Sequence, residues 1–247
     1  MRPALLSRTL HKWLSLFLGL QLVLWMVSGF YMVVVDLDFI HGDPLVRNLQ
    51  VPLSGNLPQV RFGDVAHRYA NVTQVSLKAL PSFAAPVYEI TTNGRKVLVD
   101  AADGEQLSPI SEGRIRELAQ EYYAGDGKIA ALRLIERDAP LEIQSRPLPL
   151  WRVDFDDWLD TSLYVHPDTG TLVTRRHRFW RWFDFLWMLH ILDFDTRTDM
   201  NNGLLRATTV MGVVTVLSGG WLLYFSFRRK NRATTQRATS AGHRDQQ

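Results

Sequence analysis

Histidines are the side chains best suited to chemistry in this chain of 247 residues. The seven histidines are His11, His41, His67, His166, His177, His190 and His243. No two of them have the H-x₃-H spacing that places two imidazoles on one helical face for metal binding. The chain has no cysteine, which excludes disulfides, zinc–thiolate sites and cysteine nucleophiles.

Two groups of acids are the next candidates for a site. One comprises Asp154, Asp156, Asp157 and Asp160, which we interpret as a solvated hairpin. The other, Asp193, Asp195 and Asp199, is spaced like a calcium loop. However, Arg197 occupies a ligand position there and the bidentate glutamate is missing. With no glycine-rich phosphate loop and no nucleophile–base pair, the sequence favours a protein that is not an enzyme.

The elements that must position these side chains begin with an apolar stretch, Trp13–Val35 (WLSLFLGLQLVLWMVSGFYMVVV). Its 23 residues carry no charge. A helix rises about 1.5 Å per residue and the hydrocarbon core of a bilayer is about 30 Å thick, so this stretch is long enough to cross. It exceeds the ~7–15 apolar residues of a signal peptide and lacks an A-x-A cleavage pattern. We therefore expect an uncleaved anchor.

A second span is expected from about Leu204 to Phe227. Residues 1–35 contain three Lys or Arg and no acid, residues 36–206 contain 24 acids against 19 Lys or Arg, and the tail beyond Phe227 contains six Lys or Arg and one acid. By the positive-inside rule, both termini are cytoplasmic and the centre is extracytoplasmic. Basic ends around an acidic centre also argue against nucleic acid as a partner.

Small residues at i, i+4 spacing occur in both predicted spans and permit close helix approach. They are Ser15 and Gly19 in the first span, and Thr208, Gly212, Thr215 and Gly219 in the second. Small residues are also common in membrane helices generally, so specific pairing and a homodimer remain open.

The stretch Phe179–Phe194 (FWRWFDFLWMLHILDF) is unusually aromatic. Twelve of its sixteen residues are apolar, yet it carries charges and would measure only ~24 Å as a helix, which is short for a span. Its tryptophans, Trp180, Trp182 and Trp187, suit the headgroup zone. We expect a helix at the outer membrane interface, with a buried helix of the soluble domain as the alternative.

The centre of the chain repeats one order of elements. Helical spacing recurs at Phe62, Val65, Ala66 and Tyr69, and at Ile115, Leu118, Ala119 and Tyr122. Strand-like segments follow each at Val75–Leu80 and Ala130–Glu136. A hairpin with an Asn93-Gly94 turn comes next, and LWRV and SLYVHPDTGTLV match VYEI and KVLVDAADGEQL. We infer a duplication of one helix packed on a small antiparallel sheet, with adjoining cores.

These motifs resemble the PepSY domain, and "VYEI…VLVDAADGEQL" and "LWRVDF…SLYVHPDTGTLV" look like two copies of it. The ends, "LHKWLSLFLGLQLVLWMVSGFYM" and "LH…GLLRATTVMGVVTVLSGGWLLYFSFRR", resemble PepSY-associated transmembrane proteins. The resemblance covers roughly residues 5–230. It implies an extracytoplasmic PepSY module held by helices in a bacterial inner membrane. PepSY modules elsewhere bind and restrain thermolysin-type metallopeptidases.

Some members of this family are linked to ferric-siderophore or haem redox chemistry. The positions that match its Leu-His motifs are His11 and His190. The expected topology places these two at opposite membrane faces, so they cannot bind one iron within a subunit. His190 with His41, or His11 with its copy in a dimer, remain open.

The favoured function is therefore a membrane-anchored binding or regulatory module that acts on a periplasmic or membrane protein and carries no cofactor. The alternative is a haem b electron-transfer subunit. The fold class is α+β, with two spans flanking two PepSY-like repeats. We divide the chain into a basic N-terminus (1–12), first span (13–35), linker (36–60), repeats (61–110 and 111–178), interfacial segment (179–203), second span (204–227) and disordered basic tail (228–247).

Overall fold

A computed structural model describes residues 3–49, 51–53 and 58–242, with side chains from residue 8 to residue 227. By their internal contacts the residues form two compact units. Unit 1 contains residues 1–33 and 185–247, and unit 2 contains Val34–Asp184. The fold class is α+β, with apolar helices at both termini and two small antiparallel sheets between them.

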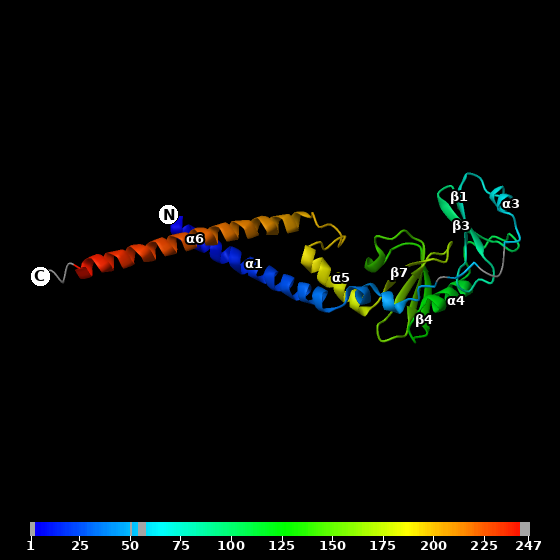
Figure 1. Ribbon diagram of the computed structural model, residues 1–247, viewed down its shortest axis with the longest axis horizontal. Helices are drawn as coiled ribbons and strands as arrows, with labels where there is room; N and C mark the ends of the chain where they lie inside the picture. Colours follow the sequence, from blue (N-terminus) through cyan, green and yellow to red (C-terminus); the bar gives the residue numbers. More distant parts are fainter. Residues whose placement is uncertain (1–2, 50, 54–57, 243–247) are drawn as a thin grey trace. The chain divides into compact units, whose positions relative to one another are not determined.

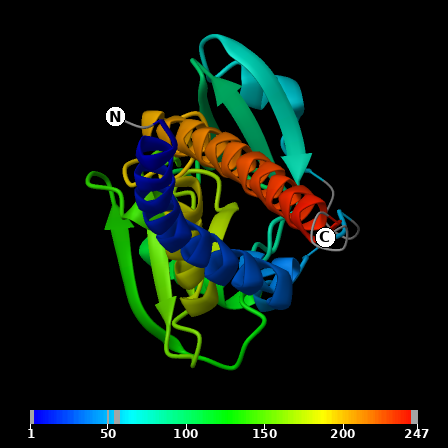
Figure 2. The same cartoon turned by 90° about the vertical axis from the view of Figure 1, so that its left-hand side faces the viewer.

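Unit 1 is helical. Helix α1 (Pro3–Val34) and helix α6 (Gly203–Gly242) run past one another in both views (Figure 1 and Figure 2). Within them, Arg8–Val34 and Gly203–Phe227 are long and apolar enough to cross a membrane. Only 6% and 0% of their most apolar windows is buried in the protein, unlike the core helices of soluble proteins. The prediction of two membrane-spanning helices is consistent with these lengths and exposures.

Helix α6 does not end where the second span was expected to end. Its backbone continues to Gly242, whereas we expected no regular structure beyond Phe227. No glycine or proline interrupts residues 228–240, so nothing in that sequence forces the helix to stop. Residues 243–247 of the predicted tail lie outside the described part of the chain.

The predicted linker, residues 36–60, begins with compact structure. Helix α2 (Leu37–His41) is capped at its start by the side chain of Asp36, which accepts a hydrogen bond from the Phe39 amide at 2.9 Å. Gly42 ends the helix in a left-handed conformation at φ +77°. A 3₁₀ turn, Asp43–Leu45, follows directly. Proline and glycine therefore act here as cap and turn residues.

The first sheet has the strand order β1-β2-β3. Strand β1 (Val72–Lys78) pairs with β2 (Val87–Thr92), which pairs with β3 (Arg95–Asp100). Asn93 and Gly94 have φ of +49° and +75°, which confirms the predicted turn of type I′.

The helix before this sheet is shorter than predicted. Helix α3 ends at Ala66 after five residues, whereas the apolar spacing extends to Tyr69. It has no side-chain cap and contains Gly63, both of which weaken a short helix.

The second sheet has the order β4-β5-β6-β7 and is preceded by a full helix. Helix α4 (Glu112–Tyr122) is capped by Ser111, whose hydroxyl accepts a hydrogen bond from the Arg114 amide. The other elements are β4 (Ile129–Ile135), a 3₁₀ turn (Leu141–Ile143), β5 (Leu150–Phe155), β6 (Ser162–Val165), β7 (Leu172–Arg176) and α5 (Arg178–Ile191). The boundary between the two units falls within α5, after Asp184.

Each sheet carries the same irregularity at the same place. The pairing of β1 with β2 shifts register between Val72 and Gln74, and that of β4 with β5 shifts between Ile129 and Ala131. The bulge thus lies near the start of the first strand in both sheets.

The turns that follow β3 and β6 also match. In the first sheet the Gly104 amide donates to the Asp100 carbonyl at 3.0 Å, with φ +78° at Gly104. In the second, the Gly170 amide donates to the His166 carbonyl at 2.9 Å, with φ +63° at Gly170. Both positions require a left-handed backbone, which glycine adopts without strain.

The main core of unit 2 joins the two sheets. Its buried side chains are Leu80, Val87, Leu98, Ile110, Ile115, Leu118, Ala119, Tyr123, Val153, Phe155, Leu163 and Val165. Most of these come from strands β2 and β3 of the first sheet, from α4, and from β5 and β6 of the second, and Leu80, Ile110 and Tyr123 lie in the connections between elements. One cluster of buried side chains is therefore shared by the two sheets.

Candidate functional site

Two of the three predicted haem histidines, His11 and His190, form hydrogen bonds within unit 1. The Nδ1 atom of His11 on α1 lies 2.9 Å from the Ser218 hydroxyl on α6. The Nδ1 atom of His190 on α5 lies 2.8 Å from the Ser28 hydroxyl on α1. His11 and Ser28 are seventeen residues apart on one helix, which corresponds to about 25 Å. One iron cannot be bound by both histidines of a single chain, because each ligand nitrogen must lie within bonding distance of it.

His41, the third predicted haem residue, belongs to unit 2. It is exposed in the last turn of α2, and its backbone carbonyl accepts a hydrogen bond from the Arg175 Nε at 3.0 Å. No group of three or more metal-binding side chains occurs within the described residues.

Around His190, two tryptophans build a compact polar cluster. The indole of Trp25 donates to the His190 carbonyl at 2.8 Å, and the Trp187 ring is stacked on the imidazole with an interplanar angle of 7°. Ser28 is 1% exposed and completes the cluster from α1. Polar side chains inside a membrane bundle form hydrogen bonds between helices in this way.

The inward face of α1 is polar, and the sequence analysis did not identify it. On this face, Gln21 and Ser28 are buried, and His11 and Ser15 are half-buried. Together with Leu18 and Trp25 they recur every three or four residues, which places them on one helical face. The spacing of Ser15, Gln21 and Ser28 within Trp13–Val35 was the sequence signal for this face.

The small residues proposed for helix packing differ in their surroundings. A Cβ atom added at Gly219 would lie 2.9 Å from the His11 imidazole, so α1 and α6 approach closely there. Nothing lies within 4 Å of such an atom at Gly19 or Gly212. Ser15 lies beside His11, with its Oγ 3.5 Å from Nε2, and Thr208 is buried. The Thr215 hydroxyl donates to the Met211 carbonyl of its own helix.

The three tryptophans assigned to the membrane interface have different environments. Trp182 is 57% exposed. Trp180 is covered by the Arg176 guanidinium, which lies 3.8 Å from its ring centroid. Trp187 stacks on His190 and donates to the Arg197 carbonyl. Of the three, Trp182 is exposed, whereas Trp180 and Trp187 are half-buried.

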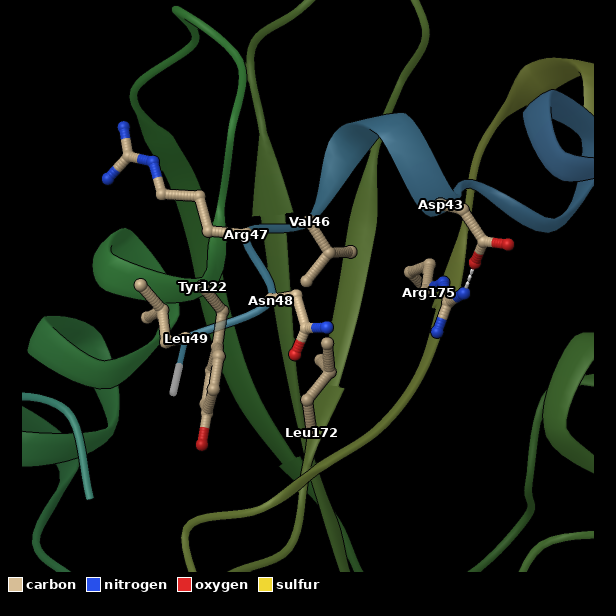
Figure 3. A pocket seen from close by; sticks show the side chains of 8 residues that line it. All are labelled: Asp43, Val46, Arg47, Asn48, Leu49, Tyr122, Leu172 and Arg175. Carbon is tan, nitrogen blue, oxygen red and sulfur yellow. Dashed lines mark ion pairs between the residues drawn. The ribbon is translucent and has the colours of Figure 1, made fainter. Parts of the chain in front are cut away.

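An open pocket of about 410 Å³ lies in unit 2 (Figure 3). It is lined by Asp43, Val46, Arg47, Asn48, Leu49, Tyr122, Leu172 and Arg175. Backbone pairing positions the linker side of the pocket, since the Arg47 amide donates to the Tyr122 carbonyl at 2.8 Å. The Ala124 amide in turn donates to the Leu45 carbonyl at 2.9 Å. A segment that sequence patterns marked as a connector is therefore one wall of the site.

The pocket combines an apolar floor with a polar rim. Leu49, Leu172 and Tyr122 are half-buried, whereas Arg47 and Asn48 are exposed. The Tyr122 hydroxyl donates to the Gly170 carbonyl at 3.1 Å, and burial raises the pKa of Tyr122 to about 12. Tyr122 is thus neutral at physiological pH and serves as a wall of the pocket. Arg175 forms an ion pair with Asp43 at one end.

Comparisons with known proteins give no family and no relative from which a function could be inferred. No family model, curated protein or solved structure matches the chain. The chemistry of the pocket itself suits a ligand with both apolar and hydrogen-bonding groups, such as a peptide side chain and its backbone.

Proposed function

We propose that the chain is a membrane-anchored, PepSY-like binding module whose central unit holds a segment of a protein partner. The observation that carries the proposal is the pocket between the linker and α4, in a unit that lies between two helices of membrane-spanning length in the sequence. Its walls bring together the linker, α4 and β7, and its lining provides no nucleophile–base pair. Binding suits such a surface better than catalysis does.

The matched sheets support the PepSY-like part of the proposal. Both copies have a bulged first strand and a glycine turn with the same hydrogen bond. The two copies also align as the sequence motifs require, because Tyr88 pairs with Val99 and Trp151 pairs with Val165. A duplicated helix-and-sheet unit is the architecture that the sequence resemblance implies.

In-membrane photo-crosslinking tests the binding function. A photoreactive amino acid at Asn48, on the rim of the pocket, is expected to form an adduct with a protein in native membranes. The same group at Asn93, in the exposed β2–β3 turn, is the control and should form none. Leu49→Asp should abolish the adduct by placing a charge on the apolar floor. Leu53→Asp, an exposed linker position outside the pocket, should not. Equal labelling from Asn48 and Asn93 would reject the pocket as a specific site.

We further propose that both termini are cytoplasmic and that unit 2 is extracytoplasmic, in a bacterial inner membrane. The charge distribution along the chain supports this orientation. Topology reporters fused at Lys230 and Gly125 should report opposite compartments. The same compartment for both fusions would refute the arrangement.

A further inference from the structure

Unit 2 carries an exposed apolar surface that includes Trp182, which the sequence already assigned to the membrane interface, and side chains from two other segments. Trp158, in the turn between β5 and β6, is 67% exposed, Trp182 on α5 is 57% exposed and Leu37 on α2 is 52% exposed. Buried large apolar side chains are the rule in soluble domains, and a group of exposed ones marks an interaction surface. We call Leu37, Phe39, Trp158, Phe179 and Trp182 the aromatic face.

Ring contacts link the three segments of the aromatic face. The Phe39 and Phe179 ring centroids lie 5.2 Å apart, and those of Trp158 and Phe179 lie 6.1 Å apart, both edge to face. Phe179 therefore joins α2 to the β5–β6 turn.

The backbone around these rings is also fixed. The buried imidazole of His177 lies with its Nε2 2.9 Å from the Phe39 carbonyl, so α2 is held against the end of β7. The face thus belongs to the folded unit and is not a loose loop.

Chain length keeps this face near a membrane. Helix α1 ends at Val34, and Leu37 follows three residues later, so its Cα lies within about 11 Å of the end of the span. The headgroup layer on each side of a bilayer is about 5–8 Å thick. Tryptophan is the residue most typical of that layer, since its ring is apolar and its N–H needs a polar partner.

The charges around the face are balanced. Arg178 forms an ion pair with Asp160 at 2.7 Å, and Arg181 donates to the Asp160 carbonyl at 2.8 Å. Asp36 and Asp38 are exposed on the α2 side. This arrangement offers no excess of positive charge to attract anionic lipids, unlike a polybasic surface.

We infer that the aromatic face inserts into the zwitterionic headgroup layer of the membrane that the two spans cross, with Trp158 and Trp182 as its deepest side chains. The inference rests on the proposed membrane insertion of α1. It adds a contact from the β5–β6 turn, which lies far from both spans in the sequence.

Fluorophores on single cysteines test the inference in the full chain, which has no native cysteine. Trp158→Cys and Leu37→Cys each receive an environment-sensitive fluorophore in phosphatidylcholine nanodiscs. Val27→Cys, exposed within the first span, is the control for insertion, and Asn93→Cys is the control for an aqueous position. Spin-labelled phosphatidylcholine is the lipid-phase quencher and iodide is the aqueous one.

We expect spin-labelled lipid to quench the fluorophores at positions 158 and 37 more than at position 93 and less than at position 27. Replacing part of the phosphatidylcholine by phosphatidylglycerol should not change this order or its extent. Behaviour at positions 158 and 37 like that at Asn93 would overturn the inference. Protection from both quenchers would also overturn it, because a protein would then cover the face. Loss of lipid quenching at position 27 would instead refute membrane insertion itself.

Discussion

The two helix-and-sheet segments of unit 2, which we propose to be copies of one unit, share a scaffold but differ in what is added to it. The first has a five-residue helix, a two-residue hairpin turn and three strands. The second has an eleven-residue helix, a longer loop between β5 and β6, and a fourth strand that leads into α5. The additions create the pocket wall at Leu172 and bring Trp158 to the aromatic face. The second copy is therefore the one elaborated for contacts beyond its own core.

Corresponding positions in the two sheets also have different electrostatic roles. Glu89 on β2 forms ion pairs with Lys78 at 2.7 Å and with Lys96 at 2.9 Å, and both lysine side chains are substantially exposed. Its counterpart on β5, Arg152, belongs to a more enclosed network with Glu142. Glu142 also accepts hydrogen bonds from Arg181 at 2.7 Å and from Tyr164 at 2.5 Å. The first sheet thus carries a local ion cluster, whereas the second uses its cluster to hold the first turns of α5.

The largest expected contrast concerns the core. Leu163 and Val97 occupy corresponding positions, but Leu163 is completely buried and Val97 only partly so. Leu163→Ala should cost about 2–5 kcal/mol of local stability, as buried leucine truncations do, and Val97→Ala clearly less. Hydrogen exchange of the β5–β6 amides in the full chain measures this loss. Equal costs at both positions would show that the copies contribute equally to the core.

The Glu142 network should give the next largest effect. Breaking a fully buried ion pair lowers the free energy of unfolding by ~3–5 kcal/mol. Glu142→Gln should lower it by less, because the Arg181 side chain is 32% exposed. Glu89→Gln should cost less again, since both of its lysine partners are more exposed. Exchange of the amides at residues 178–184 should rise for the first variant only. A rise for both would contradict the assigned role in holding α5.

The same network predicts a dependence on pH. Burial favours a raised pKa for Glu142, but the hydrogen bonds from Arg181 and Tyr164 lower it below its usual 4.5. A lowered native pKa means that the stabilisation is complete above 4.5 and is lost as the pH falls through the native value. Carboxylates protonate roughly between pH 6 and pH 3. Over this range the free energy of unfolding of the full chain should fall more steeply than that of Glu142→Gln. Parallel curves would rule out a contribution from Glu142.

Local signals in the sequence were sufficient for much of the scaffold. Asn93-Gly94 requires positive φ, and Ser111 precedes an apolar helical face, so the hairpin and the start of α4 follow from residue types alone. The pocket could not be predicted in this way. Its linker wall forms by pairing of Leu45–Arg47 with the end of α4, and that pairing depends on tertiary contact. Glu142 likewise looks like an ordinary loop residue until its arginine partners are in place.

The two glycine turns allow a matched comparison of strain and packing. Alanine at either position is forced into a left-handed conformation, which costs roughly 1–2 kcal/mol. At Gly104 the new Cβ would meet the movable end of Arg68 at 3.0 Å. At Gly170 it would meet Leu118 and Ile110 of the main core at 2.9 and 3.0 Å. Gly170→Ala should therefore be the more destabilising by a further ~1–3 kcal/mol of overpacking.

Thermal unfolding of the two alanine variants in one detergent measures that difference. Equal melting temperatures would indicate that the core relaxes around Gly170 without loss. A larger effect at Gly104 would reverse the comparison and would mean that the first copy is the more tightly packed.

The smallest expected effect separates the turn geometry from the ion pair that the second copy adds. Asp160 and Asn93 both have positive φ, +51° and +49°, in the loops that join corresponding strands. Asp and Asn tolerate this conformation similarly, so exchanging one for the other leaves the backbone preference nearly unchanged. Asp160→Asn removes the ion pair between Asp160, which is 63% exposed, and Arg178, which is 51% exposed. Its loss should lower the free energy of unfolding by about 0.2–1 kcal/mol. Asn93→Asp should cost nothing measurable, and added salt should remove the difference because exposed ion pairs are screened. A loss at Asp160 that persisted in high salt would instead assign its contribution to the fold of the loop that carries Trp158.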